Sequence, residues 1–83
     1  MNGRLAVVDD DRAFTEYLAT WLGSRGLTVD VFHSGGAFVD SLRSGIAPDV
    51  VLLDVLMPDL NGLDTLRAIR QLNSATQVIM LSG

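Results

Sequence analysis

Three apolar segments of the chain each end in polar side chains whose types suit chemistry. These residues are Asp9, Asp10 and Asp11 after the first segment, Asp54 after a later one and Ser82 after the last. If the segments are neighbouring strands of one sheet, three or four carboxylates and a hydroxyl converge at one edge. Carboxylates in such a cluster repel one another, so the cluster requires a cation.

The chemistry that this cluster supports is the binding of a hard divalent cation. The candidate ligands are all oxygen atoms, with no His or Cys nearby in the sequence, which favours Mg²⁺ first and Mn²⁺ second. Mg²⁺ binds one or two carboxylates and keeps waters that a phosphate can replace, so phosphoryl chemistry is favoured over ion storage. A carboxylate beside the cation can act as a nucleophile and form an aspartyl phosphate.

The segments that must position these residues alternate between strand-like and helix-like patterns. In chain order they are 5–8, 12–25, 27–32, 35–44, 50–53, 63–72 and 78–81. Apolar runs without alternation indicate strands buried on both faces, and strands that alternate with helices indicate a parallel sheet. We therefore expect an α/β domain with the element order βαβαβαβ, in which 27–32 is a half-buried edge strand. Open sheets of this kind bind ligands at the carboxyl ends of their strands, where the acids stand.

The composition excludes several classes of protein. The chain has 83 residues and 48% hydrophobic residues, which fits one domain with a thin core and excludes a disordered acidic tail. The absence of cysteine excludes a disulfide framework and favours a cytoplasmic location. A net charge of −4 and six scattered arginines argue against direct nucleic-acid binding. No apolar run approaches the roughly 18 residues of a membrane span, so we expect no membrane partner.

Four segments, taken together, resemble the response-regulator receiver domain of bacterial two-component signalling. They are Val7 to Asp10, Pro48 to Asp54, Met57 to Gly62 and Val78 to Gly83. They come in the family's order, at spacings like the family's, and the resemblance runs over all 83 residues. It implies a flavodoxin-like open parallel sheet, truncated after the fourth strand to βαβαβαβ, and a single receiver-like domain over residues 1–83.

The resemblance assigns roles to the acids. Asp54 matches the phosphoacceptor and is also a metal ligand. Asp10 matches the acid that binds the metal directly, and Asp9 matches the acid that acts largely through a metal-bound water. The backbone carbonyl of Leu56 matches a further metal ligand, and its apolar side chain cannot position the water that hydrolyses the phosphoryl group. The resemblance therefore implies Mg²⁺, or Mn²⁺ in its place, as the cofactor.

Other positions match the loops around the phosphoacceptor. Ser82 matches the switch residue that donates a hydrogen bond to the phosphoryl group, and Gly83 matches the small residue that leaves this group open to water. Met57, Pro58 and Gly62 match the loop that follows the phosphoacceptor, where Met57 packs and Pro58 shapes the chain.

The resemblance implies a phosphoacceptor module that is not an enzyme beyond its own phosphorylation and dephosphorylation. The phosphoryl group would come from a sensor histidine kinase or a small phosphodonor. Family domains continue with a fourth helix, a fifth strand and a fifth helix, which lie beyond these 83 residues. The family's fifth strand carries a lysine that pairs with the phosphoryl group, and without it we expect phosphorylation to lose about 1.5–3 kcal/mol of stabilisation. The chain is interpreted as a fragment of a longer regulator with an output domain, or as a naturally short receiver.

A chain that ends at the fourth strand is expected to expose an apolar sheet edge. This edge has neither charge nor proline, and it consists of Val78, Ile79, Met80 and Leu81. Such edges pair with other chains, so we expect a homodimer or a higher oligomer. The alternative function is therefore a signalling-incompetent receiver that assembles through this edge. A phosphohydrolase of related topology is disfavoured. Those enzymes use a second aspartate two residues after the nucleophile, where this chain has Leu56, and they need a lysine, of which this chain has none.

A few residues have purely structural interpretations. Asp11 is expected to cap the helix over 12–25, and Phe14 and Trp21 are expected to lie in the core. His33 lies past the strand over 27–32 and away from the acids, so it is interpreted as a surface histidine rather than as a proton shuttle.

Overall fold

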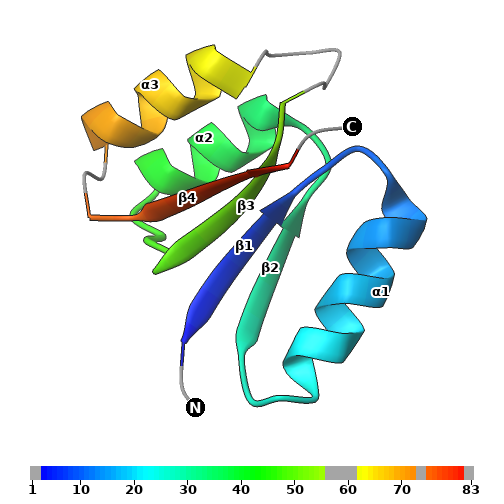
Figure 1. Ribbon diagram of the computed structural model, residues 1–83. Helices are drawn as coiled ribbons and strands as arrows, with labels where there is room; N and C mark the ends of the chain where they lie inside the picture. Colours follow the sequence, from blue (N-terminus) through cyan, green and yellow to red (C-terminus); the bar gives the residue numbers. More distant parts are fainter. Residues whose placement is uncertain (1–2, 56–61, 73–74, 82–83) are drawn as a thin grey trace.

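The computed structural model describes residues 3–55, 62–72 and 75–81 (Figure 1). Its elements are β1 (Arg4–Val8), α1 (Arg12–Gly23), β2 (Thr28–Phe32), α2 (Gly35–Arg43), β3 (Val50–Asp54), α3 (Gly62–Leu72) and β4 (Gln77–Leu81). All strand pairs are parallel, and the sheet has the order β2-β1-β3-β4. The predicted α/β class, element order and edge position of β2 are therefore confirmed, with bounds that differ by one or two residues.

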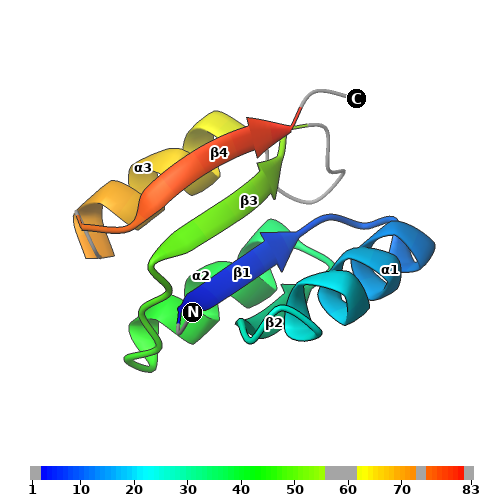
Figure 2. The same cartoon turned by 60° about the horizontal axis from the view of Figure 1, so that its bottom comes forward.

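Helices cover both faces of the sheet (Figure 2). One face carries α2 and α3, which also contact each other, and α1 lies alone on the opposite face against β1 and β2. None of the described helices is long and apolar enough to cross a bilayer.

The main core lies between the sheet and the pair of helices α2 and α3. Its fully or almost fully buried side chains are Ala6, Val8, Phe38, Leu42, Val51, Leu53 and Ile69. The rings of Phe32 and Phe38 meet edge to face with their centroids 5.3 Å apart, which closes the β2 end of this core. Burial of each large apolar side chain stabilises the fold by about 1.5–3 kcal/mol, so this layer is a main source of the domain's stability.

Local chemistry fixes where the first two helices begin and where α2 ends. The Asp11 carboxylate accepts a hydrogen bond from the Phe14 N–H (3.1 Å), which confirms the predicted cap of α1. The Ser34 hydroxyl accepts from the Ala37 N–H in the same way at the start of α2. Gly45 follows α2 with φ = +102°, a conformation that other residues rarely adopt, and so ends this helix.

The prediction that Phe14 and Trp21 lie in the core is wrong. Their exposed fractions are 37% and 47%, and the fully buried residue of α1 is Thr15. No other described helix packs on this face of the sheet to cover them. The Arg25 guanidinium instead lies 4.7 Å from the ring centre of Trp21, so a cation covers part of the ring.

We expect the two faces of α3 to respond differently to truncation. Ile69→Val should destabilise the domain by about 0.5–1.5 kcal/mol, and Ile69→Ala by about 2–5 kcal/mol, because the Ile69 side chain is fully buried. Leu63→Ala on the exposed face of the same helix should cost no more than about 0.5 kcal/mol. Urea unfolding followed by circular dichroism measures both. Equal losses at the two positions would contradict this description of the core.

Candidate metal and phosphoryl site

The register of the two central strands places acids side by side. β1 pairs with β3 so that Val8 lies opposite Leu53, and both side chains are fully buried. The next residue along the chain is an aspartate in both cases: Asp9 directly follows β1, and Asp54 is the last residue of β3. The convergence predicted from the strand ends is therefore a direct result of pairing two buried strands in this register.

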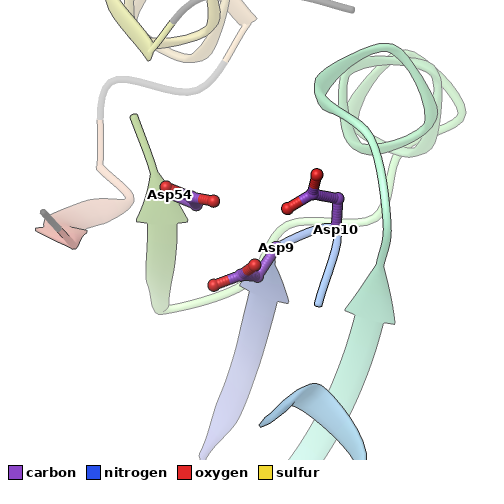
Figure 3. Close-up of side chains that lie close together, drawn as sticks. All are labelled: Asp9, Asp10 and Asp54. Atoms are coloured by element: carbon purple, nitrogen blue, oxygen red, sulfur yellow. The ribbon is translucent and has the colours of Figure 1, made fainter. Parts of the chain in front are cut away.

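Asp9, Asp10 and Asp54 form one cluster at the carboxyl edge of the sheet (Figure 3). One carboxylate oxygen from each residue lies within 4.8 Å of the others. Asp9 and Asp54 are half-buried and Asp10 is exposed, so the cluster has a closed side toward the core and an open side toward solvent. Among the described residues it is the single group of three or more potential ligands with this spacing.

Two hydrogen bonds hold Asp9 in place. Its backbone N–H donates to the carbonyl oxygen of Phe32 at the end of β2 (3.0 Å). Its carboxylate oxygen Oδ1 accepts from the backbone N–H of Asp11 (2.9 Å). One carboxylate oxygen is thus oriented by the start of α1, and the carboxylate keeps lone pairs that a cation can use.

The electrostatics of the cluster favour a cation. Partial burial raises the pKa of Asp9 above its usual value, and the charges of Asp54, Asp10 and Asp11 raise it further. The hydrogen bond from the Asp11 N–H acts in the opposite direction. A divalent cation would reverse the repulsive contribution, and carboxylates beside an open position supply the oxygen ligands that Mg²⁺ prefers. The residues present therefore fit the expected cofactor.

The structure accounts for the predicted site residues in three groups. It brings Asp9, Asp10 and Asp54 together, while their individual roles stay predictions. Gly62 is the first residue of α3, and Val78, Ile79, Met80 and Leu81 belong to the edge strand β4. Outside the described residues lie Leu56, Met57, Pro58, Ser82 and Gly83.

Sequence reasoning missed one polar contact next to the cluster. The Thr15 side chain is fully buried, and its hydroxyl oxygen lies 3.1 Å from Nε2 of His33. These residues are 18 positions apart, and neither stands in a recognisable motif. The contact depends on how α1 packs against β2, which no local pattern encodes.

Comparisons with known proteins agree with the geometry. A family model described as the response regulator receiver domain matches residues 5–83. The chain is similar to the transcriptional regulatory protein CpxR of Escherichia coli strain K12, with 46% identity over 80 residues that cover 96% of this chain and 33% of CpxR. It is similar to the response regulator MprA of Mycobacterium bovis, with 38% identity over 83 residues that cover 100% of this chain and 36% of MprA.

A solved structure shows the same arrangement of strands and helices. The response regulator TrrA of Thermotoga maritima, in complex with Mg²⁺–BeF, superposes with a TM-score of 0.86 and 31% identity. The match covers 96% of this chain and 69% of TrrA. The chain spans about a third of the length of the two curated relatives above.

We expect Asp9→Asn to stabilise the metal-free protein at pH 7. The raised pKa means that folding favours the neutral form of Asp9, so the wild type loses stability as the pH rises through that pKa. Asparagine keeps an acceptor for the Asp11 N–H and removes one negative charge. Because solvent screens the cluster, the repulsion removed with this charge is limited to about 1 kcal/mol. Thermal unfolding in EDTA should show a midpoint about 4–8 °C higher at pH 7 and a shrinking gain toward pH 4.

The control for this prediction is Asp40→Asn on α2. Asp40 is exposed and pairs with Arg43 at 3.6 Å, outside the cluster, so this variant removes a charge without relieving repulsion. It should leave the midpoint unchanged or slightly lower. An Asp9→Asn protein that is less stable than the wild type at pH 7 in EDTA would contradict the electrostatic description of the site.

Proposed function

Because the chain belongs to the response regulator receiver domain family, we propose that it is a phosphoacceptor module that takes a phosphoryl group on Asp54 with the help of Mg²⁺. The observation that carries this proposal is the convergence of Asp54 with Asp9 and Asp10 at one edge of the sheet. Receiver domains are signalling modules of two-component systems, and the phosphoryl group is the signal that such a module stores. TrrA, a response regulator with the same arrangement of strands and helices, was solved in complex with Mg²⁺–BeF, which supports Mg²⁺ as the cation.

The proposed chemistry assigns one task to each acid. An oxygen of the Asp54 carboxylate attacks the phosphorus of the donor, a new O–P bond forms, and the donor's bond to phosphorus breaks with its electron pair. Asp9 and Asp10 hold the cation, and the cation supplies charge neutralisation for the transferring group when it is bound. The fixed orientation of Asp9 by Asp11 and Phe32 keeps this side of the site preorganised.

The resemblance extends the proposal to residues around the site. The backbone carbonyl of Leu56 would be a further metal ligand, while Met57 and Pro58 would shape the loop that carries it. Ser82 would donate a hydrogen bond to the phosphoryl group, and Gly83 would leave that group open to water. These assignments come from matched positions in the sequence and stay proposals.

The partners follow from the family. We propose a sensor histidine kinase as the phosphodonor and a cytoplasmic location, and an output domain if the chain is part of a longer regulator. CpxR is a transcriptional regulatory protein of which this chain covers 33%, so a separate segment would contact nucleic acid in a regulator of that kind. The net charge of −4 makes the receiver itself a poor partner for a phosphate backbone.

A second candidate function is self-association through the outer edge of β4. Ile79 and Met80 have exposed fractions of 51% and 40%, and β4 contains no charged residue. The Gln77 N–H donates to Asp49 (3.0 Å) and the Leu81 carbonyl accepts from Val55 (3.3 Å), so odd-numbered residues of β4 face β3. By the alternation of a strand, the backbone groups of Val78 and Met80 face outward.

This pattern is complementary to itself. If a two-fold axis passes through Ile79, Val78 of one copy lies opposite Met80 of the other, and each such pair can exchange two hydrogen bonds. The two Ile79 side chains then meet on one face of the joined sheet. We propose that the 83-residue chain forms a homodimer by antiparallel pairing of two β4 strands.

Phosphorylation is expected to depend on Asp54 and on Mg²⁺. Intact-mass spectrometry after incubation with Mg²⁺ and acetyl phosphate should show a gain of one phosphoryl group in the wild type. The gain should disappear with Asp54→Asn, because the amide is not a nucleophile of this kind, and it should disappear in EDTA. Asp40→Asn is the matched control and should gain the group like the wild type. A wild type that gains nothing, or an Asp54→Asn protein that gains as much, would overturn the proposal.

Dimerisation is expected to depend on the β4 edge. Light scattering after size exclusion should give a dimer mass for the wild type at high micromolar concentration and a monomer mass for Ile79→Lys, because like charges directly opposite each other destabilise strand pairing. Leu63→Lys also replaces an exposed apolar side chain by lysine, on α3, and should stay dimeric. A monodisperse wild-type monomer would sink this second candidate.

A further inference from the structure

Asp9 belongs to a closed ring of interactions that reaches beyond the acid cluster. Its N–H donates to Phe32 (3.0 Å), the residue before His33, and Nε2 of His33 lies 3.1 Å from the hydroxyl of Thr15. The Thr15 N–H donates to the carbonyl of Asp11 (3.0 Å). The Asp11 N–H donates to Oδ1 of Asp9 (2.9 Å), which closes the ring.

The contact between His33 and Thr15 is the one link of this ring that two side chains make. The Thr15 hydroxyl is buried and has a single proton, which it donates to the carbonyl oxygen of Arg12 (3.1 Å). Its oxygen is then the acceptor for an Nε2–H of His33. A buried hydroxyl that loses a partner carries a desolvation penalty, so this link resists separation of α1 from the end of β2.

The ring matters because of what the first turn of α1 carries. Asp9, Asp10 and Asp11 lead directly into this helix, and among the described helices α1 is the one without a helical neighbour on its face of the sheet. Repulsion from Asp54 pushes the acid-bearing segment away from β3. A side chain that ties this turn to β2 opposes that displacement and keeps Asp9 and Asp10 at their positions.

We propose that His33 is a positioning residue for the cation site, which acts through its hydrogen bond to Thr15 and the first turn of α1. The inference rests on the proposed binding of Mg²⁺ at Asp9, Asp10 and Asp54. It replaces the expectation of a surface histidine without a role. Neither His33 nor Thr15 touches the cation in this proposal, and both act by fixing Asp9 and its neighbours.

The test compares variants on both sides of the hydrogen bond. His33→Ala and Thr15→Val remove its donor and its acceptor, and each should weaken Mg²⁺ affinity about 10-fold in calorimetric titrations. The double variant should be no weaker than either single one, because both changes break the same link. His33→Gln presents an amide N–H, and Thr15→Ser keeps the hydroxyl, so each should recover affinity relative to its apolar counterpart.

A second readout needs no metal. In EDTA, the amide protons of Asp11, Phe14 and Thr15 should exchange faster with solvent in His33→Ala than in the wild type, while those of α3 should not change. Ile69→Val is the control, because it lowers global stability by repacking the opposite face and should leave Mg²⁺ affinity unchanged. Long-range nitrogen NMR spectra of His33 should show the Nε2–H tautomer in the neutral ring.

The outcomes separate this inference from the proposed function. A wild type with no measurable Mg²⁺ affinity overturns the proposed function and the role of His33 in it. A wild type that binds Mg²⁺ alongside a His33→Ala variant with equal affinity and equal amide exchange overturns this inference alone. Additive losses in the double variant also overturn it, since they would mean that the two side chains act separately.

Discussion

Repulsion between carboxylates at the carboxyl edge of the sheet is the constraint that the rest of the domain must satisfy. Oxygens of Asp9, Asp10 and Asp54 lie within 4.8 Å, where two unit charges repel by about 1 kcal/mol even under water-like screening. The ends of β1 and β3 limit how far Asp9 and Asp54 can move apart, because the residues before them, Val8 and Leu53, are fully buried on paired central strands. Hydrophobic burial therefore holds together groups that would otherwise move apart. The pKa of Asp9 is raised first by its partial burial and then by the neighbouring charges.

This arrangement gives Asp54 a position at the end of a strand, while Asp9 and Asp10 directly follow one. The position of a strand end is fixed by the pairing of the whole sheet, so Asp54 needs no loop to hold it. Asp9 lies one residue past its strand and receives two backbone hydrogen bonds in compensation, to Phe32 and from Asp11. Asp11 has a double use, since its carboxylate caps α1 while its N–H orients Asp9. The capping of a helix and the shaping of the site are thus one structural event.

The sequence was sufficient for features encoded locally. Continuous apolar runs predicted the strands and the order of the elements. The acids that follow these runs predicted the convergence of Asp9 with Asp54. Features that depend on packing were not predictable in this way. Phe14 and Trp21 have helical spacing, but their exposure depends on which elements cover α1. The pairing of His33 with a residue 18 positions away depends on the docking of that helix.

The two layers of the domain divide the site between them. Asp54 ends a strand whose buried side chains Val51 and Leu53 belong to the core under α2 and α3, whereas Asp10 belongs to the segment that leads into α1. A cation held by Asp10 and Asp54 therefore joins the core under α2 and α3 to the segment that leads into α1. Part of its binding free energy then appears as stabilisation of the first turn of α1 against local opening, because ligands stabilise the states that bind them. Occupancy of the site and docking of α1 are therefore coupled, and any contact that already holds this turn raises the affinity that the cation can reach.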